Sequence, residues 1–131
     1  MGDRRGTNDC DAKVTPAAMV QRMDSLLGHI QAATPGSQVF LANVIATGLR
    51  PDMNACIVDF NKLVPGVVKA WAAKGMKIYF VDAYGALSPG CGDAGAQKHL
   101  CGGHQIHPTS AGYPRMASAF ALSILENFVP P

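Results

Sequence analysis

The chain has 131 residues, of which 48% are apolar and 15% charged, a composition typical of one globular domain rather than of a disordered chain. Its net charge of +2 comes from scattered residues, without the basic stripe that binds a nucleic-acid backbone or an anionic membrane surface. No apolar run reaches the roughly 18 residues that a membrane-spanning helix needs. We therefore expect neither nucleic-acid nor membrane partners, and the oligomeric state stays open.

The amino terminus carries no export signal. A secretory leader has a basic start followed by an apolar stretch, whereas residues 1–9 are polar. Taken literally, this sequence indicates a cytosolic protein.

Four cysteines argue against that interpretation. Cys91 and Cys101 bracket a glycine-rich segment that cannot build its own core, and a disulfide closing such a loop would contribute about 2–3 kcal/mol. A persistent disulfide needs an oxidising compartment, so whether these two residues are bonded stays open. One way to reconcile both signals is that Met1 is not the natural start. Cys10 and Cys56 have no comparable context, and we expect them to be small buried residues.

The first helix is expected at 16–33. Thr15 followed by Pro16 is typical of a helix start, and apolar residues recur at helical spacing until a Pro-Gly pair. A nearly continuous apolar stretch follows at 39–45, which favours a strand buried on both faces of a parallel sheet.

The second helix presents an apolar face from Ile57 to Trp71 and should end at Gly75. Pro65 lies inside it. Because a proline frees the carbonyl group four residues earlier, we expect it to kink or split the helix and to leave Asn61 oriented for a local polar role.

A second buried strand is expected at 78–82, and a long glycine-rich loop leads from it to His107. The final helix should begin near Thr109 or Pro114 and run to about Asn127. Its inner apolar stripe is expected to be Tyr113, Met116, Ala117, Phe120, Ala121, Ile124 and Leu125.

Helices alternating with buried strands are typical of a doubly wound α/β fold with a parallel sheet. Only two strands are found here, and two parallel strands need neighbours that satisfy their edges and cover their faces. We therefore expect a three-layer αβα fold truncated at the N-terminus. The whole chain, 1–131, is interpreted as one incomplete domain.

Two motifs frame this pattern. The tetrapeptide Gly-Thr-Asn-Asp that starts at Gly6 resembles the third sequence block of the SGNH hydrolases, the GDSL-type esterases, and His107 with its following proline resembles the end of their fifth block. The match covers about 6–126 in the right order, and the residues between are similar to those of carbohydrate esterases that deacetylate xylan. Either motif alone is a weak signal, and both in register on an α/β pattern are a stronger one.

The resemblance implies a flavodoxin-like αβα fold and serine-type ester hydrolysis without a cofactor, acting on a small ester or an acetylated carbohydrate. It implies that His107 is the general base and that the side-chain amide of Asn8 is one oxyanion-hole donor, with Gly6 and Asp9 in supporting positions. This chemistry needs an imidazole to take the proton of a hydroxyl nucleophile, and donors that meet the carbonyl oxygen as it gains charge.

The nucleophile itself is missing. The family's serine follows a Gly-Asp pair in a block upstream of the position of Gly6, and no serine of this chain has that context. Gly2 and Asp3 resemble the pair, but Arg4 stands where the serine would be. We therefore expect the chain as given to be inactive and poorly stable, although complete relatives are active and often secreted.

A second departure lies three residues before the histidine, where the family has an aspartate and this chain has His104. His104 cannot supply the fixed negative charge that orients an imidazole and stabilises its protonated form. A backbone carbonyl could orient His107 instead, or Asp93 could reach it from the loop.

Two alternatives of other classes stay open. Cys91, His99, Cys101, His104 and His107 could together hold a structural zinc ion, although their spacings are poor for one. A pseudoenzyme or binding remnant of the family would instead be a stable monomer without hydrolytic activity. Our main expectation includes no metal.

Overall fold

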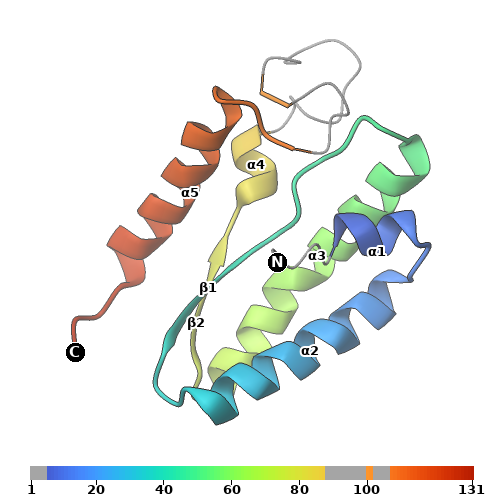
Figure 1. Ribbon diagram of the computed structural model, residues 1–131. Coiled ribbons are helices and arrows are strands. Elements are labelled where there is room, and N and C mark those ends of the chain that lie inside the picture. The colour runs from blue at the N-terminus through green and yellow to red at the C-terminus, as the bar shows by residue number, and fades with distance from the viewer. Residues whose placement is uncertain (1–5, 88–99, 102–106) are drawn as a thin grey trace.

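The computed structural model describes residues 6–87, 100–101 and 107–131. Its elements are α1 (Thr7–Asp11), α2 (Pro16–Ala33), β1 (Gln38–Ala42), α3 (Pro51–Ala73), β2 (Lys77–Val81), α4 (Ala83–Leu87) and α5 (Gly112–Asn127). The two strands are parallel, and Figure 1 shows α5 on one side of them and α2 with α3 on the other. The expected three-layer α/β arrangement is confirmed. No helix within the described ranges has the length and apolar character to cross a membrane.

Helix α2 has the predicted bounds. The backbone N–H of Ala18 donates a hydrogen bond to Thr15 Oγ1 at 3.2 Å, and Pro16 occupies the first turn. A hydroxyl side chain that accepts a hydrogen bond from a free backbone N–H, followed by a proline, stabilises a helix start through neighbouring residues alone. The start of this helix could therefore be predicted from the sequence. The helix buries Met19 and Leu27 against the core.

Helix α3 is one continuous helix, so of the two predicted effects of Pro65, a kink or a split, the split does not occur. Pro65 lies on the exposed side, while the buried residues Ile57, Phe60 and Val64 lie on the side that meets the core. The packing of this apolar face outweighs the backbone hydrogen bond that a proline removes.

The polar role expected for Asn61 is confirmed. Its Oδ1 accepts a hydrogen bond from the Val44 N–H at 2.9 Å, and its Nδ2 donates to the Val44 carbonyl at 2.6 Å. Because the backbone of Val44 pairs with a helix side chain instead of a strand, β1 ends at Ala42 and not at the predicted residue 45.

Strand β1 is partly exposed along its whole length and not buried on both faces as predicted. One edge pairs with β2, and no strand in the described part of the chain pairs with the other edge. Strand β2 is better covered, with Ile78 and Val81 buried.

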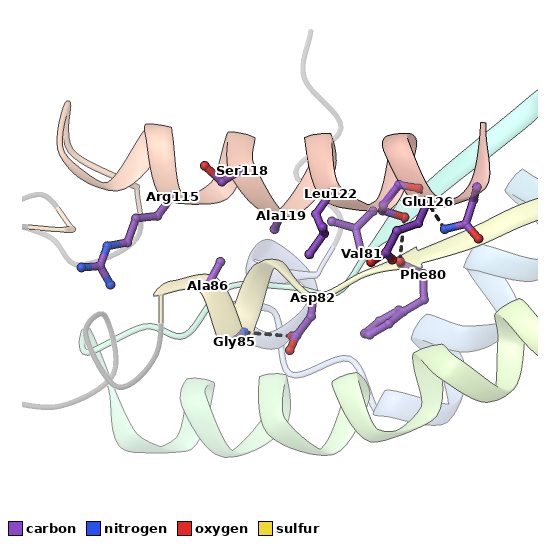
Figure 2. A pocket seen from close by; sticks show the side chains of 12 residues that line it. Phe80, Val81, Asp82, Gly85, Ala86, Arg115, Ser118, Ala119, Leu122 and Glu126 are labelled. Carbon is purple, nitrogen blue, oxygen red and sulfur yellow. Dashed lines mark hydrogen bonds between the residues drawn. The ribbon is translucent and has the colours of Figure 1, made fainter.

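The residues after β2 form the short helix α4 before the predicted loop. Its first turn is held by Asp82: the Gly85 N–H donates to Asp82 Oδ1 at 2.9 Å, and the Ala86 N–H donates to the Asp82 carbonyl at 3.2 Å. A Cβ atom at residue 85 would overlap the Asp82 carboxylate, so a larger residue there would displace the side chain that accepts the Gly85 hydrogen bond (Figure 2).

Helix α5 turns another face to the sheet than predicted. Gly112 and Ser123 are its buried residues, and of the predicted stripe Met116 packs against the core. Leu125 is 84% exposed, and Tyr113 and Ile124 are exposed as well. The prediction fails because the described sheet has two strands, which are too narrow to cover the whole apolar surface of this helix.

Cys10 and Cys56 form a disulfide that joins α1 to α3, so the expectation of two unpaired buried cysteines is wrong. They are 46 residues apart, and the fold brings their Cα atoms to 5.7 Å. Cys101 is also disulfide-bonded. Cys91, its expected partner, lies outside the described residues. A bonded Cys101 has no thiolate for a metal, which removes one ligand from the zinc alternative.

Candidate active site

The carboxyl ends of β1 and β2 meet at one edge of the sheet, which is where open α/β folds bind ligands. Asn43 follows β1 and Asp82 follows β2. Asn43 Nδ2 donates to Asp82 Oδ1 at 2.8 Å, and Asn43 Oδ1 accepts from the Tyr84 N–H at 2.7 Å. Since Asn43 is buried, these bonds fix the strand ends relative to each other.

The first motif lies against this edge through Gly6. Gly6 has a φ of +106°, and a Cβ atom there would overlap the side chain of Val44. Glycine is therefore required both by the backbone conformation and by the close approach. Gly6 was expected in a supporting position, and neither of these two reasons could be identified from the sequence alone.

Asn8 lies in the first turn of α1 and is exposed. Within the part of the chain that the structure describes, its side chain makes no hydrogen bond. An amide without a structural partner at this edge is available to a ligand.

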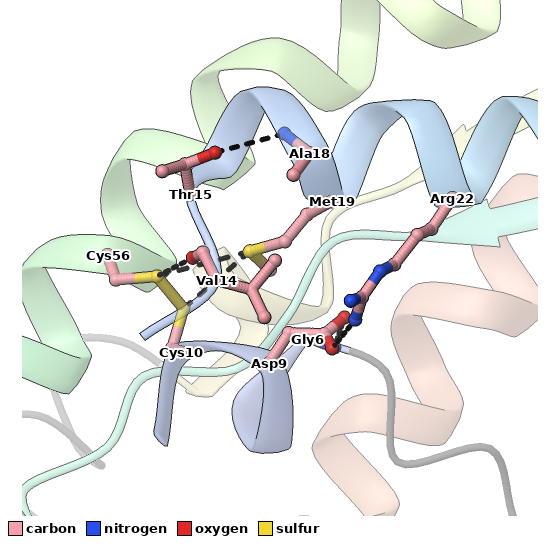
Figure 3. Close-up of polar contacts among 9 residues, drawn as sticks. All are labelled: Gly6, Asp9, Cys10, Val14, Thr15, Ala18, Met19, Arg22 and Cys56. Atoms are coloured by element: carbon pink, nitrogen blue, oxygen red, sulfur yellow. Dashed lines mark hydrogen bonds and ion pairs between the residues drawn. A yellow bond between two sulfur atoms is a disulfide. The ribbon is translucent and has the colours of Figure 1, made fainter. Parts of the chain in front are cut away.

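Asp9 contacts both Gly6 and Arg22, as Figure 3 shows, and so fixes the start of the helix α1 that carries Asn8. The Gly6 N–H donates to Asp9 Oδ2 at 3.4 Å, and Arg22 Nη1 donates to Asp9 Oδ1 at 2.6 Å. The Asp9 side chain is 13% exposed and that of Arg22 54%. Asp9 thus connects the start of α1 to α2. Arg22 was missed by sequence reasoning, because no motif links residues 13 positions apart.

The disulfide holds the opposite side of α1. Met19 Sδ packs 3.9 Å from Cys10 Sγ and 4.0 Å from Cys56 Sγ, in a buried sulfur cluster (Figure 3). A helix of five residues has too few internal hydrogen bonds to persist alone. Its position therefore depends on contacts with α2 and α3.

An ion pair adds a third attachment. Arg50 Nη1 donates to Asp11 Oδ1 at 2.8 Å, and Arg50 Nε donates to Asp52 Oδ1 at 3.1 Å. The hydrogen bond with Asp52 raises the pKa of Arg50, and the same bond lowers the pKa of the Asp52 carboxyl. Because all three side chains are exposed to solvent, this attachment is weak compared with the disulfide.

The second motif begins at His107, whose side chain is exposed. The next residue, Pro108, forms an isolated antiparallel bridge with Cys101. The Thr109 N–H donates to the Leu100 carbonyl at 2.9 Å. These contacts attach the segment that carries His107 to residues 100–101.

Residues 100–101 are in turn buried at the strand ends. Leu100 and Cys101 pack with Ala46, which lies in the β1–α3 connection, and with Leu87 of α4. The connection thus contacts the first motif through Val44 and the support of the second through Ala46. No hydrogen bond joins Asn8 to His107 in the described residues. His104 and Asp93 lie outside them.

Comparisons with known proteins identify the family. Residues 5–115 match the model of the GDSL-like lipase/acylhydrolase family. A family 3 carbohydrate esterase from Talaromyces cellulolyticus has a similar fold, with a TM-score of 0.75 and 21% identity over 92% of this chain and 54% of that chain. The family 3 carbohydrate esterase of Clostridium thermocellum is similar too, with a TM-score of 0.68 and 20% identity over 91% of this chain and 52% of that chain.

A search of curated proteins found no match. The chain spans about half the length of the two solved esterases. The family model covers most of the chain, including both motifs, and confirms the resemblance first seen in the sequence. The chain belongs to the GDSL-like lipase/acylhydrolase family.

Proposed function

We propose that this chain carries the general base, His107, and one oxyanion-hole donor, Asn8, of an ester hydrolase that deacetylates carbohydrate in its complete form. The observation that carries the proposal is that one short connection, between β1 and α3, contacts the first motif through Val44 and, through Ala46, the residues 100–101 to which the segment of the second motif is attached. An amide donor and an imidazole at one edge of a sheet are two of the groups that acyl transfer requires.

In the proposed reaction a hydroxyl oxygen attacks the ester carbonyl carbon, and its proton passes to the His107 imidazole. Asn8 Nδ2 donates a hydrogen bond to the carbonyl oxygen while that oxygen carries negative charge. The alcohol then leaves with the proton from the imidazolium, and an acyl-enzyme remains. Water attacks the acyl carbon by the same proton route and releases the acid.

The sequence has no serine in the family's nucleophile position. We therefore propose that the nucleophile belongs to a segment outside residues 1–131, and that this chain alone does not turn over. Removing the nucleophile while keeping the base leaves binding and charge stabilisation but no acyl-enzyme route.

One observation supports the substrate class. Two of the similar solved proteins are family 3 carbohydrate esterases.

The disulfides are evidence about the cellular compartment in which the complete enzyme acts. Cys10, Cys56 and Cys101 are all bonded, and persistent disulfides form in oxidising environments. We propose that the complete enzyme acts outside the cytosol.

The chain alone gives the first test. Hydrolysis of p-nitrophenyl acetate by residues 1–131 should equal that of its His107→Ala variant and of the buffer. A rate that falls on His107→Ala substitution would overturn the proposed lack of turnover.

A protein extended by the in-frame sequence upstream of Met1 gives the second test, with acetate release from acetylated xylan as the readout. Asn8→Ala should lower kcat about 10²- to 10³-fold, and His107→Ala should abolish measurable release. His29→Ala is the matched control, because His29 is an exposed histidine of α2. Unchanged rates in both variants would overturn the assigned roles. Binding of xylan without acetate release would favour the non-catalytic alternative.

A further inference from the structure

Helix α1 carries the proposed oxyanion donor, Asn8, and has few internal contacts that could hold it in place. It spans five residues, and its N-cap residue, Gly6, has no side chain that could accept a backbone hydrogen bond. A side-chain contact at the helix start comes instead from Asp9, whose carboxylate accepts from the Gly6 N–H. The orientation of α1 therefore depends on what holds Asp9 and its neighbour Cys10.

One face of α2 contacts both of these residues, as Figure 3 shows. Met19 packs against Cys10, and Arg22 pairs with Asp9 at 2.6 Å. Met19 and Arg22 are three residues apart, so they share a face of the helix. Because α2 has 18 residues and buries Met19 and Leu27, it is a firm support for the much shorter α1.

The disulfide alone does not fix the direction in which Asn8 points. Its bond to Cys10 holds one point of α1, about which a helix of five residues can still rotate. The ion pair holds a second point, at Asp9. Consecutive helix residues point about 100° apart, so holding both Asp9 and Cys10 sets the direction of the preceding side chain, Asn8.

The Asp9 carboxylate is well placed for this role because it is largely shielded from water. Its side chain is 13% exposed, against 57% for Asp11, which pairs with Arg50 near the other end of α1. Screening by water weakens an exposed ion pair, so the pair of Asp9 with Arg22 is the stronger of the two. Arg22 itself is 54% exposed, so replacing it opens no buried cavity and should cost little stability.

We propose that Arg22 is a positioning residue for the oxyanion-hole donor: its guanidinium holds Asp9, and Asp9 holds the helix start from which Asn8 donates. This role rests on the proposed function, because it requires that Asn8 meets the oxyanion. A donor that is already oriented stabilises the charged oxygen without reorganisation, and a misplacement of about 1 Å costs much of the rate. Arg22 thus acts on the reaction through Asn8.

Kinetics of the protein extended upstream of Met1 test this role. Arg22→Gln should lower kcat for acetate release from acetylated xylan about tenfold and leave KM unchanged, because the hydrogen bond from Asn8 strengthens only as the oxygen gains charge. Arg22→Lys keeps the charge but not the planar fork of donors, so it should restore part of the rate. Lys69→Gln is the matched control, since Lys69 is an exposed basic residue of α3, and it should leave kcat unchanged.

A double-mutant cycle separates an action through Asn8 from a general loss of structure. Asn8→Ala should lower kcat, and adding Arg22→Gln should lower it no further, because the side chain that Arg22 positions is then absent. A further tenfold decrease in the Asn8→Ala background would overturn the role of Arg22 and leave the proposed function standing. So would a parent-like kcat for Arg22→Gln beside a lowered kcat for Asn8→Ala. An Asn8→Ala variant as fast as the parent would overturn the proposed function, and the role of Arg22 with it.

Hydrogen exchange in residues 1–131 tests how α1 is held, without any catalysis. The Cys10 N–H donates to the Gly6 carbonyl at 3.0 Å, and Arg22→Gln should speed its exchange about fivefold, the loss expected for one partly shielded ion pair. The Met19 N–H donates to the Thr15 carbonyl at the start of α2, and its exchange should stay unchanged. Equal protection of the Cys10 N–H in the parent and the variant would overturn the role of Arg22.

Discussion

The two faces of the β1–β2 sheet differ in how completely they are packed. On the face covered by α2 and α3, Leu27, Ile57 and Val64 are among the side chains with almost no exposed surface, and a disulfide attaches α1 to α3. On the α5 face, the helix buries only Gly112 and Ser123. The first face therefore contributes most of the buried packing of the described fold, whereas most of the side chains of α5 are exposed on the second.

The largest expected effect comes from opening the disulfide on the packed face. A Cys10→Ser, Cys56→Ser double variant should lower the free energy of unfolding by about 4 kcal/mol, from the loop-closure entropy of a 46-residue separation. Urea denaturation without reductant measures the loss. Met19→Leu, which keeps the volume beside the sulfurs, should cost less than about 1.5 kcal/mol and is the control. An unchanged midpoint in the double variant would show that packing alone positions α1.

Truncating one apolar side chain on each face tests the comparison directly. Ile57 has 0% of its surface exposed, and Ile57→Ala should cost about 2–5 kcal/mol through lost burial and a residual cavity. Leu125→Ala, at a residue 84% exposed, should stay within about 0.5 kcal/mol. Comparable losses at the two positions would mean that the α5 face is covered in solution, and the contrast between the faces would no longer hold.

The elements that sequence predicted well depend on residues within one or two turns of each other. Thr15 and Pro16 define the start of α2, and Asn61 takes the polar role expected beside Pro65. The Cys10–Cys56 bond and the pairing of Asp9 with Arg22 were missed, because they exist only once α1 lies against α2 and α3.

Helix α5 shows a different limit. Its periodicity predicted the helix correctly and its buried surface incorrectly, since a hydrophobic stripe says which residues share a face and not what covers that face. Among the proposed site residues, Asn8 and His107 were assigned through the family motifs alone. Their attachment through Val44 and Ala46 was visible only in three dimensions.

A smaller loss of stability is expected when the contact between α5 and the edge of β2 is removed. Ser123 Oγ donates to the Phe80 carbonyl at 3.1 Å, so Ser123→Ala should leave that carbonyl unpaired at a cost of about 1 kcal/mol. Thermal unfolding measures it. Ser118 Oγ donates within its own helix, to the Pro114 carbonyl at 2.9 Å, and Ser118→Ala should change little. Equal decreases in Tm for the two variants would show that the destabilisation comes from a change in helix propensity and not from the lost contact with β2.

The smallest expected effect concerns the exposed pair Arg50 and Asp52 at the start of α3, on the packed face. The hydrogen bond from Arg50 lowers the pKa of Asp52, so the folded protein keeps this carboxylate charged at a lower pH than the unfolded chain does. Its stabilising contribution is therefore present above the unfolded-state pKa and disappears as the pH falls through the folded-state pKa.

Asp52→Asn should accordingly lower the Tm slightly at neutral pH and leave it unchanged at strongly acidic pH, where the parent carboxyl is protonated too. Asp59→Asn is the control for the loss of an exposed helical carboxylate, because Asp59 pairs with Lys62 within α3 and not at the helix start. Since the Arg50 side chain also reaches Asp11 of α1, Arg50→Gln should reproduce the effect of Asp52→Asn and add the loss of that second contact. A Tm difference for Asp52→Asn that is the same at both pH values would mean that the side chain stabilises the helix start without its charge.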